Sequence, residues 1–222
     1  IHVTLTLVGQ SVTVPNGTGV VVAAKTVDIE IPVFCYHEKL GPFGCCRMCL
    51  VEVEKMPKLA TACTQTVTPG MVVKTDTPKV VKGRQGVLEF TLLNHPLDCP
   101  VCDKGGECPL QNNTFKYGPG DTRMAFERAN NVKAAPLSPV ITLDQERCIA
   151  CQRCTRYSDI IEKDQALVML NRGFHNEIGT FNGQPYTTRF SGNVIDICPV
   201  GALTNTSFRF QARTWDLENA KT

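Results

Sequence analysis

Residues 148–154 read "CIACQRC", and residues 198–202 read "CPVGA". The first stretch holds Cys148, Cys151 and Cys154, and the second adds Cys198 directly before a proline. Two residues between cysteines let a chain turn around one metal ion or cluster. Three such cysteines and a remote Cys-Pro are typical of a [4Fe–4S] site, whereas zinc ribbons use two CxxC pairs about 15–20 residues apart. We therefore predict a [4Fe–4S] cluster on these four cysteines.

A second group lies upstream, where residues 95–108 read "HPLDCPVCDKGGEC". His95, Cys99, Cys102 and Cys108 make a full set of four ligands on one loop, which suits a structural zinc site or an iron–sulfur cluster. The stretch alone leaves both open, and the neighbouring cysteine groups favour a cluster. A histidine in place of a thiolate removes one negative charge, which raises the reduction potential when other factors are equal.

The third group consists of Cys35, Cys46, Cys49 and Cys63. A long loop that bears several cysteines and is closed by a later one is how plant-type ferredoxins hold a [2Fe–2S] cluster, although their C-x4-C-x2-C spacing differs from this one. We take Cys46 as the ligand because it forms the CxxC pair with Cys49. The adjacent Cys45 is expected to be a buried small residue or an alternate ligand.

The bulk composition supports ligands rather than disulfides. The chain has 222 residues, twelve cysteines and a formal net charge of +2. Disulfide scaffolds are usually small and cysteine-dense throughout, whereas these cysteines bunch into three groups. Without a basic tract, nucleic acid is not expected as a partner, and the longest apolar runs are far too short to span a bilayer. No signal peptide is visible, and the chain begins at Ile1 rather than Met.

The cofactors would change this charge. Oxidised all-cysteine clusters carry roughly −2 each and a histidine-ligated one roughly −1, so three clusters would bring the total to about −3. The charge of the bare sequence is therefore a poor guide to partners.

The fold class expected is α+β, beginning with a β-grasp domain. Residues 1–15 alternate in period two around a Gly-Gln-Ser break, which predicts a hairpin. Residues 19–27 predict a short helix, and residues 49–54 and 71–75 predict further strands. Strands around one crossing helix, with cysteines in the loop between, indicate a [2Fe–2S] ferredoxin-like domain over residues 1–77.

A helix is expected next. Pro78 suits the first helical position, and apolar residues then recur near helical spacing. Gly83 and Gly86 weaken this prediction because glycine destabilises helix interiors. We assign residues 78–118 to a segment that holds the histidine-containing group on a loop after this helix.

The second half of the chain is expected to end in another small domain. Residues 112–139 show little periodicity and are expected to be a linker or surface wrap, with the linker itself at 119–139. Residues 140–222 are expected to form a bacterial-ferredoxin-like [4Fe–4S] domain. Its predicted elements are strands at 140–144 and 166–170 and a helix within 148–163.

Together, these motifs resemble the N-terminal iron–sulfur region of the large electron-transfer subunit (75 kDa type) of respiratory complex I, the NADH:quinone oxidoreductase. The resemblance covers essentially the whole chain through "IPVFCYHEKLGPFGCCRMCLVEVEK", "FTLLNHPLDCPVCDKGGECPLQ", "RCIACQRCTRYS" and "SGNVIDICPVGALT". It implies one [2Fe–2S] and two [4Fe–4S] clusters. The ligand sets implied are Cys35, Cys46, Cys49 and Cys63; His95, Cys99, Cys102 and Cys108; and Cys148, Cys151, Cys154 and Cys198. Cys45 departs from the family pattern, in which we expect a small residue such as Ala or Asn.

The resemblance also implies a function. The chain has neither GxGxxG after a strand nor a P-loop, so we expect no NADH site on it. The family implies that an FMN- and NADH-binding subunit delivers single electrons, which the [2Fe–2S] and all-cysteine [4Fe–4S] clusters pass toward the quinone, with the His-ligated cluster as a branch or tuning site. No substrate chemistry is expected on this chain. Family members continue into a molybdopterin-oxidoreductase-like domain, and this chain stops about where that domain should begin.

The setting implied is a hetero-oligomer in the peripheral arm of a membrane complex, facing bacterial cytoplasm or mitochondrial matrix, without insertion of this chain into the membrane. The alternatives are an equivalent relay subunit of an NAD-linked hydrogenase or formate dehydrogenase, a free multi-cluster ferredoxin, and a structural zinc module. Arg47, Arg153 and Arg156 adjoin ligands and either offset cluster charge or form ordinary salt bridges. Packing or surface roles are expected for His37 and His175, and a core or interface position for Trp215.

Overall fold

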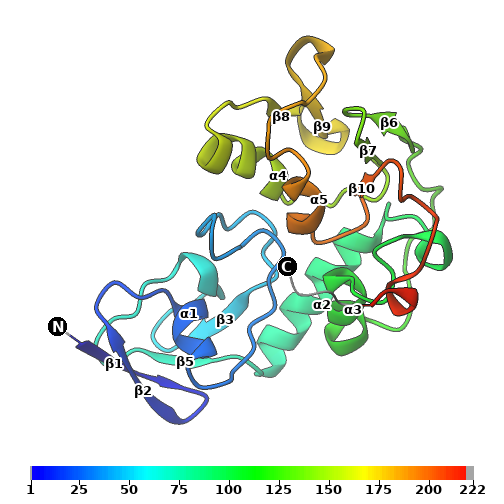
Figure 1. Ribbon diagram of the computed structural model, residues 1–222. Helices are drawn as coiled ribbons and strands as arrows, with labels where there is room; N and C mark the ends of the chain where they lie inside the picture. Colours follow the sequence, from blue (N-terminus) through cyan, green and yellow to red (C-terminus); the bar gives the residue numbers. More distant parts are fainter. Residues whose placement is uncertain (1, 219–222) are drawn as a thin grey trace. The chain divides into compact units, whose positions relative to one another are not determined.

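The computed structural model describes residues 2–218, and the chain divides into two units. Unit 1 comprises Ile1–Phe90 with Tyr117–Gly120, and unit 2 comprises Thr91–Lys116 with Asp121–Thr222. Unit 1 carries a five-stranded sheet, and unit 2 carries a three-stranded and a two-stranded sheet (Figure 1). The mixed α and β content confirms the predicted fold class, while the finer domain boundaries stay predictions. None of the helices among the described residues is long and apolar enough to cross a membrane.

Unit 1 is built on a mixed sheet with the strand order β2-β1-β5-β3-β4. Strands β1 and β2 form the predicted antiparallel hairpin. Its turn is closed by Val8 and Gly9, whose φ angles of 47° and 81° are both positive, as a tight type I′ turn requires. Strand β1 also pairs in parallel with β5. The strands are β1 (His2–Leu7), β2 (Gln10–Pro15), β3 (Leu50–Val53), β4 (Ala60–Thr61) and β5 (Val72–Lys74).

One short helix, α1 (Val20–Lys25), shares the core of this sheet. Val3, Leu5 and Leu7 alternate with more exposed residues along β1, as a strand with one buried face requires. They pack in one cluster with the buried residues of α1. Burial of each Val or Leu side chain stabilises the fold by roughly 1.5–3 kcal/mol. This sheet and helix confirm the predicted β-grasp arrangement.

The predicted helix after Pro78 is also present, as α2 (Pro78–Leu92). Its two glycines differ in their surroundings. A Cβ atom at Gly83 would lie 2.9 Å from a Leu59 methyl and 3.0 Å from a Leu50 methyl, so the missing side chain lets the helix approach β3 closely. A Cβ atom at Gly86 would meet nothing within 4 Å. Gly83, which weakened the helix prediction, is therefore required for the close packing of α2 against Leu50 and Leu59.

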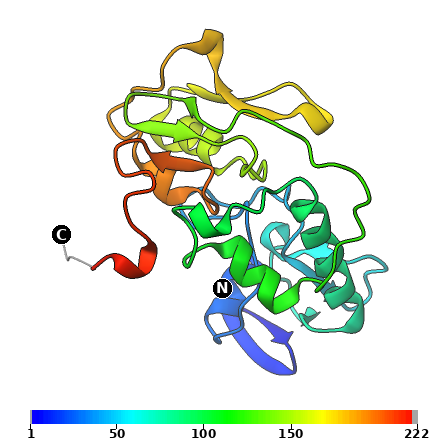
Figure 2. The same ribbon diagram turned by 90° about the vertical axis from the view of Figure 1, so that its right-hand side faces the viewer.

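A further helix, α3 (Pro109–Tyr117), corrects the prediction that residues 112–139 are a linker or surface wrap. Leu110 and Asn113 lie on one buried face of this helix, and the Thr114 hydroxyl donates to the Leu110 carbonyl at 2.7 Å. The sequence hid the helix because its apolar stripe is short and holds a buried asparagine. Beyond it, residues 118–134 form a long loop without helix or strand (Figure 2).

The remainder of unit 2 contains short elements around the third cysteine group. Its three-stranded sheet has the order β10-β7-β6, and β8 pairs with β9. The strands and helices are β6 (Ala135–Pro136), β7 (Ile141–Leu143), β8 (Leu167–Leu170), β9 (Glu177–Thr180), β10 (Leu203–Asn205), α4 (Arg153–Tyr157) and α5 (Asn193–Ile197). A π-helical turn, Ser158–Glu162, extends α4. Single 3₁₀ turns occur at Ala62–Thr64, Cys99–Val101, Gly173–His175, Phe181–Gly183 and Thr214–Asp216. These elements confirm the predicted strands near 140–144 and 166–170 and the helix within 148–163.

Candidate iron–sulfur sites

The first cysteine group gathers in unit 1, where the loop between α1 and β3 meets the 3₁₀ turn after β4. Cys35, Cys49 and Cys63 are buried and Cys46 is half-buried. The backbone N–H of Cys35 donates to the Cys46 sulfur at 3.4 Å. Hydrogen bonds from neighbouring thiols, Cys45 first, lower the pKa of Cys35, and a hydrogen bond from Cys63 lowers that of Cys49. These contacts join the four predicted ligands into one group, with Cys35 linked to Cys46 and Cys63, and Cys63 linked to Cys49.

Cys45 is exposed, which corrects the expectation that it is a buried small residue. The loop reverses sharply here, because Gly44 and Arg47 have positive φ angles of 78° and 59°. Adjacent cysteines then differ in burial, with Cys46 the less exposed of the two. A hydrogen bond still links the thiols of Cys45 and Cys35, so the fifth cysteine lies at the margin of the site.

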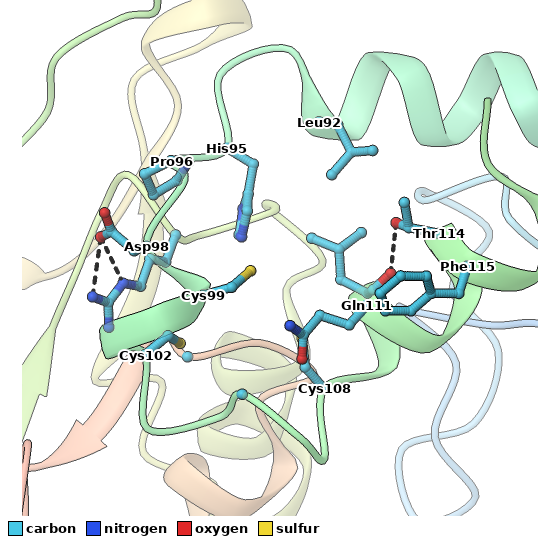
Figure 3. Close-up of a pocket in the computed structure, with 14 residues that line it drawn as sticks. Leu92, His95, Pro96, Asp98, Cys99, Cys102, Cys108, Gln111, Thr114 and Phe115 are labelled. Atoms are coloured by element: carbon cyan, nitrogen blue, oxygen red, sulfur yellow. Dashed lines mark hydrogen bonds and ion pairs between the residues drawn. The ribbon is translucent and has the colours of Figure 1, made fainter. Parts of the chain in front are cut away.

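The second group lines a cavity of about 280 Å³ within unit 2. His95 follows α2, Cys99 begins the 3₁₀ turn Cys99–Val101, Cys102 directly follows that turn, and Cys108 directly precedes α3. All four predicted ligands are among the residues around this cavity. In Figure 3, the His95 ring and the Cys99 sulfur point toward the same open space.

Three features of this cavity fit a histidine-ligated cluster. Burial, followed by the charge of Arg147, lowers the pKa of His95 to about 4, so its imidazole is neutral near pH 7, as a metal ligand must be. The buried Nδ1 atom of His95 has no hydrogen-bond partner. A Cβ atom at Gly201 would lie 2.2 Å from the Cys102 sulfur, so only glycine leaves room for that thiol. The donor set and its surroundings therefore fit the predicted group.

The third group surrounds a smaller cavity, of about 20 Å³, whose lining includes Cys148, Cys151, Cys154 and Cys198. The suitability of this site for a [4Fe–4S] cluster rests on its four cysteine ligands and their burial rather than on the volume of the cavity. Burial raises the pKa of Cys148 to about 11 and that of Cys151 to about 12. Iron binding must therefore displace protons from these thiols.

The backbone of this group wraps tightly. Ala150 and Gln152, the residues between its first three cysteines, have φ angles of 51° and 58°. Alternating left-handed residues turn the chain between consecutive ligands. The Ala150 N–H donates to the Cys148 sulfur at 3.4 Å, and Arg153 donates to the Ile197 carbonyl at 3.3 Å, immediately before the remote Cys198.

Among the described residues, no group of three or more His, Cys, Asp or Glu is arranged to hold a single metal ion.

Two buried arginines next to these groups were not expected. Arg147 is 2% exposed, lines the cavity of His95 and donates to Asp98 at 3.0 Å, with Asp144 at 3.3 Å. Arg84 is also 2% exposed and donates to the Leu50 carbonyl at 2.9 Å, one residue beyond Cys49. The available signals were the position of Arg147 directly before Cys148 and the helical spacing of Arg84 between Val80 and Leu88. Arg47, which adjoins a ligand in the sequence, is exposed.

The C-terminal residues hold the loop of the second group, which the sequence also did not predict. Arg213 donates to the carbonyl of Cys99 at 3.0 Å and to that of Pro100. The Thr214 hydroxyl donates to the Gly105 carbonyl at 3.0 Å. Trp215, expected in a core or interface, is 68% exposed. One edge of its ring packs against Gly106, because it lies 3.2 Å from the position that a Cβ atom on Gly106 would take. We call residues 210–216 the clasp.

Three sequence families match the chain, one for each cysteine group and in the same order. The "2Fe-2S iron-sulfur cluster binding domain" matches residues 2–78. The "NADH-ubiquinone oxidoreductase-G iron-sulfur binding region" matches residues 84–123. The "NADH-quinone oxidoreductase subunit 3, ferredoxin-like domain" matches residues 138–204. The chain therefore carries a [2Fe–2S] binding domain followed by [4Fe–4S] binding domains.

Curated relatives agree with this assignment. The G subunit of the Streptomyces coelicolor NADH-quinone oxidoreductase is 49% identical over 217 residues, 97% of this chain and 26% of the relative. The mitochondrial NADH dehydrogenase [ubiquinone] iron-sulfur protein 1 of Solanum tuberosum is 47% identical over 213 residues, 96% of this chain and 29% of the relative. Over nearly its whole length, the chain therefore matches the iron–sulfur region of these complex I subunits. It spans about a quarter of the length of these relatives.

A solved structure shares the fold of this complex I iron–sulfur region. A chain in the crystal structure of an NAD+-reducing [NiFe]-hydrogenase in the H2-reduced state superposes with a TM-score of 0.84 at 29% sequence identity. The match covers 95% of this chain and 90% of the hydrogenase chain. The fold of the complex I iron–sulfur domains therefore also occurs in a hydrogenase.

Proposed function

We propose that this chain is the iron–sulfur relay of a proton-translocating NADH:quinone oxidoreductase, the respiratory complex I. The observation that carries the proposal is the succession of three iron–sulfur regions, each of which contains one group of four candidate ligands. The proposed [2Fe–2S] ligands are Cys35, Cys46, Cys49 and Cys63. The proposed [4Fe–4S] ligands are His95, Cys99, Cys102 and Cys108 for one cluster, and Cys148, Cys151, Cys154 and Cys198 for the other.

Bound clusters would accept and donate single electrons, and the chain itself would fix their positions and tune their potentials. The cysteines would bind iron as thiolates, and His95 would bind through a neutral ring nitrogen. The burial of most of these ligands would exclude water. The clasp would hold the carbonyl groups of Cys99 and Gly105 and so maintain the loop of the second site. No bond-breaking chemistry is assigned to the chain.

The partners proposed are a flavin-bearing NADH-binding subunit and other subunits of the hydrophilic arm, which makes the protein part of a hetero-oligomer. The arm would be peripheral to a membrane complex, on the cytoplasmic side in bacteria or the matrix side in mitochondria. Identities near 48% to several complex I subunits support this setting.

An equivalent relay in an NAD-linked hydrogenase is the second candidate. The observation that favours it is the TM-score of 0.84 to a chain of an NAD+-reducing [NiFe]-hydrogenase, which this chain covers to 90%. The sequence identity to that chain is 29%, against 49% to the Streptomyces coelicolor relative, and the complex I function is therefore preferred. The subunits that copurify, and the presence or absence of nickel, would separate the two.

The relay is tested by metal analysis and graded reduction of anaerobically purified protein. We expect about ten iron atoms per chain, acid-labile sulfide, and electron paramagnetic resonance (EPR) signals from one [2Fe–2S] and two [4Fe–4S] clusters. His95→Cys should alter only one [4Fe–4S] signal, and the matched change of a histidine outside the ligand sets, His175→Cys, should alter none. Zinc without iron and sulfide would exclude the relay. Three unchanged signals in the His95 variant would exclude His95 as a ligand.

A further inference from the structure

Arg84 is a buried cation on the apolar face of helix α2. It lies one helical turn from both Val80 and Leu88, and these three are the buried residues of the helix. Arginine stays charged in proteins, and burial of an unpaired charge is costly enough that buried charges are nearly always paired. A charge at the centre of an apolar stripe therefore needs a counter-charge.

The partners of Arg84 within the chain are neutral. One guanidinium N–H donates to the Leu50 carbonyl at 2.9 Å, and the guanidinium lies 5.1 Å from the centre of the Tyr117 ring. The buried Nε has no hydrogen-bond partner. Among the described residues, no carboxylate lies within ion-pair distance of Arg84, and Asp76, whose charge acts on it from further away, is exposed.

The position of Arg84 points to the missing charge. Leu50, whose carbonyl accepts from the guanidinium, directly follows Cys49 in the sequence. Gly83 keeps this approach close, since a Cβ atom there would lie 3.0 Å from a Leu50 methyl. The helix is thus packed so that its one buried cation faces the end of the cysteine loop.

We propose that Arg84 is the counter-charge of the [2Fe–2S] site on Cys35, Cys46, Cys49 and Cys63, and that it favours the reduced cluster. The proposal rests on the proposed function, which assigns a cluster to these cysteines. An oxidised cluster with four thiolates carries roughly −2, and reduction by one electron makes it more negative. A fixed positive charge nearby stabilises the reduced form more than the oxidised form, so Arg84 is a residue that tunes the potential of the site.

The simpler alternative is that Arg84 is structural and only joins α2 to the end of β3. The two roles differ in the sign of a stability effect. With a structural role, Arg84→Met destabilises the protein with or without its cluster. With a counter-charge role, Arg84→Met lowers the thermal midpoint of the cluster-loaded protein but raises that of the iron-chelated protein, because replacing a buried uncompensated charge by an apolar side chain is stabilising.

The decisive experiment is an EPR-monitored redox titration of anaerobically purified protein. Two unit charges on the order of 10 Å apart, at an effective dielectric constant near 20, interact strongly enough to change an equilibrium roughly tenfold. We expect Arg84→Met to lower the ratio of reduced to oxidised [2Fe–2S] cluster about tenfold at the wild-type midpoint, a negative shift of about 59 mV. The matched control is Lys82→Met, which removes an exposed positive charge from the same helix and should leave the midpoint unchanged.

The outcomes are separable. Arg84→Lys, which keeps the charge, should retain most of the wild-type potential, and the two [4Fe–4S] signals should not move in any variant. An Arg84→Met protein with an unchanged [2Fe–2S] midpoint would overturn this inference and leave the relay intact. If that variant does not hold the cluster, its iron-chelated form decides, since a lowered thermal midpoint there overturns the counter-charge role. A wild-type protein without a [2Fe–2S] signal would instead refute the proposed function.

Discussion

Replacing Gly201 by alanine should remove one cluster and leave the fold in place. The new Cβ atom would lie 2.2 Å from the Cys102 sulfur, whereas ordinary van der Waals contacts begin at 3.4 Å. The sulfur would therefore have to move by about 1.2 Å. Metal–ligand distances tolerate only about 0.2 Å, so the displaced thiol could not serve as a ligand in its present position. Steric overpacking itself costs about 1–3 kcal/mol, which a folded domain can survive.

The assay is iron content combined with EPR of reduced Gly201→Ala protein. We expect iron to fall from about ten to about six atoms per chain, with loss of the signal that His95→Cys alters. The control is Gly192→Ala, since a Cβ atom at Gly192 would meet nothing within 4 Å. Full iron content and an unchanged spectrum in Gly201→Ala would refute the geometry of the second site. Equal losses in both variants would instead indicate general destabilisation.

Two further predictions concern packing and the clasp. Gly86→Ala should stabilise the protein by about 0.5–1 kcal/mol in urea unfolding, because alanine favours helix and the site is open, whereas Gly83→Ala should destabilise it by forcing Leu50 and Leu59 apart. Arg213→Met should speed the loss of iron to a chelator from the His95 site alone, because two hydrogen bonds to the cluster loop disappear. The control is Arg189→Met, which changes an exposed arginine and should leave the rate of iron loss unchanged. If Arg213→Met also leaves that rate unchanged, the clasp does not stabilise the His95 site.

Local patterns predicted those elements whose sequence carries a clear period. The hairpin of β1 and β2 follows from alternation around a Gly-Gln-Ser break, although the turn itself is formed by Val8 and Gly9, and α2 follows from Pro78 and an apolar repeat. Helix α3 was missed because its buried stripe is only Leu110 and Asn113. Spacing between cysteines likewise suggested the three ligand sets, since each contains a CxxC pair and the second lies wholly within residues 95–108.

Features that depend on tertiary contacts were not visible in the sequence. Arg213 reaches the Cys99 carbonyl across 114 positions of the chain, and no local pattern records such a contact. Within "CPVGA", no sequence feature distinguishes Gly201, and only the structure shows that it lies against Cys102. Cys45 was expected to be a buried small residue or an alternate ligand, but it is exposed on a loop where Gly44 and Arg47 adopt left-handed backbone conformations.

The two unexpected arginines differ in how their charge is balanced, and the difference parallels the ligand sets. Arg147 lies at the proposed histidine-ligated site, where an oxidised cluster would carry roughly −1, and two carboxylates, Asp98 and Asp144, already compensate its charge. Arg84 lies at the proposed all-cysteine [2Fe–2S] site, where the cluster would carry roughly −2, and only neutral groups contact it. The more negative site would thus have the uncompensated cation. Replacing Arg147 should shift a potential less than replacing Arg84, because Asp144, a carboxyl that pairs with Arg147 and whose pKa is raised by burial, takes up a proton when this arginine is lost and so offsets the change in charge.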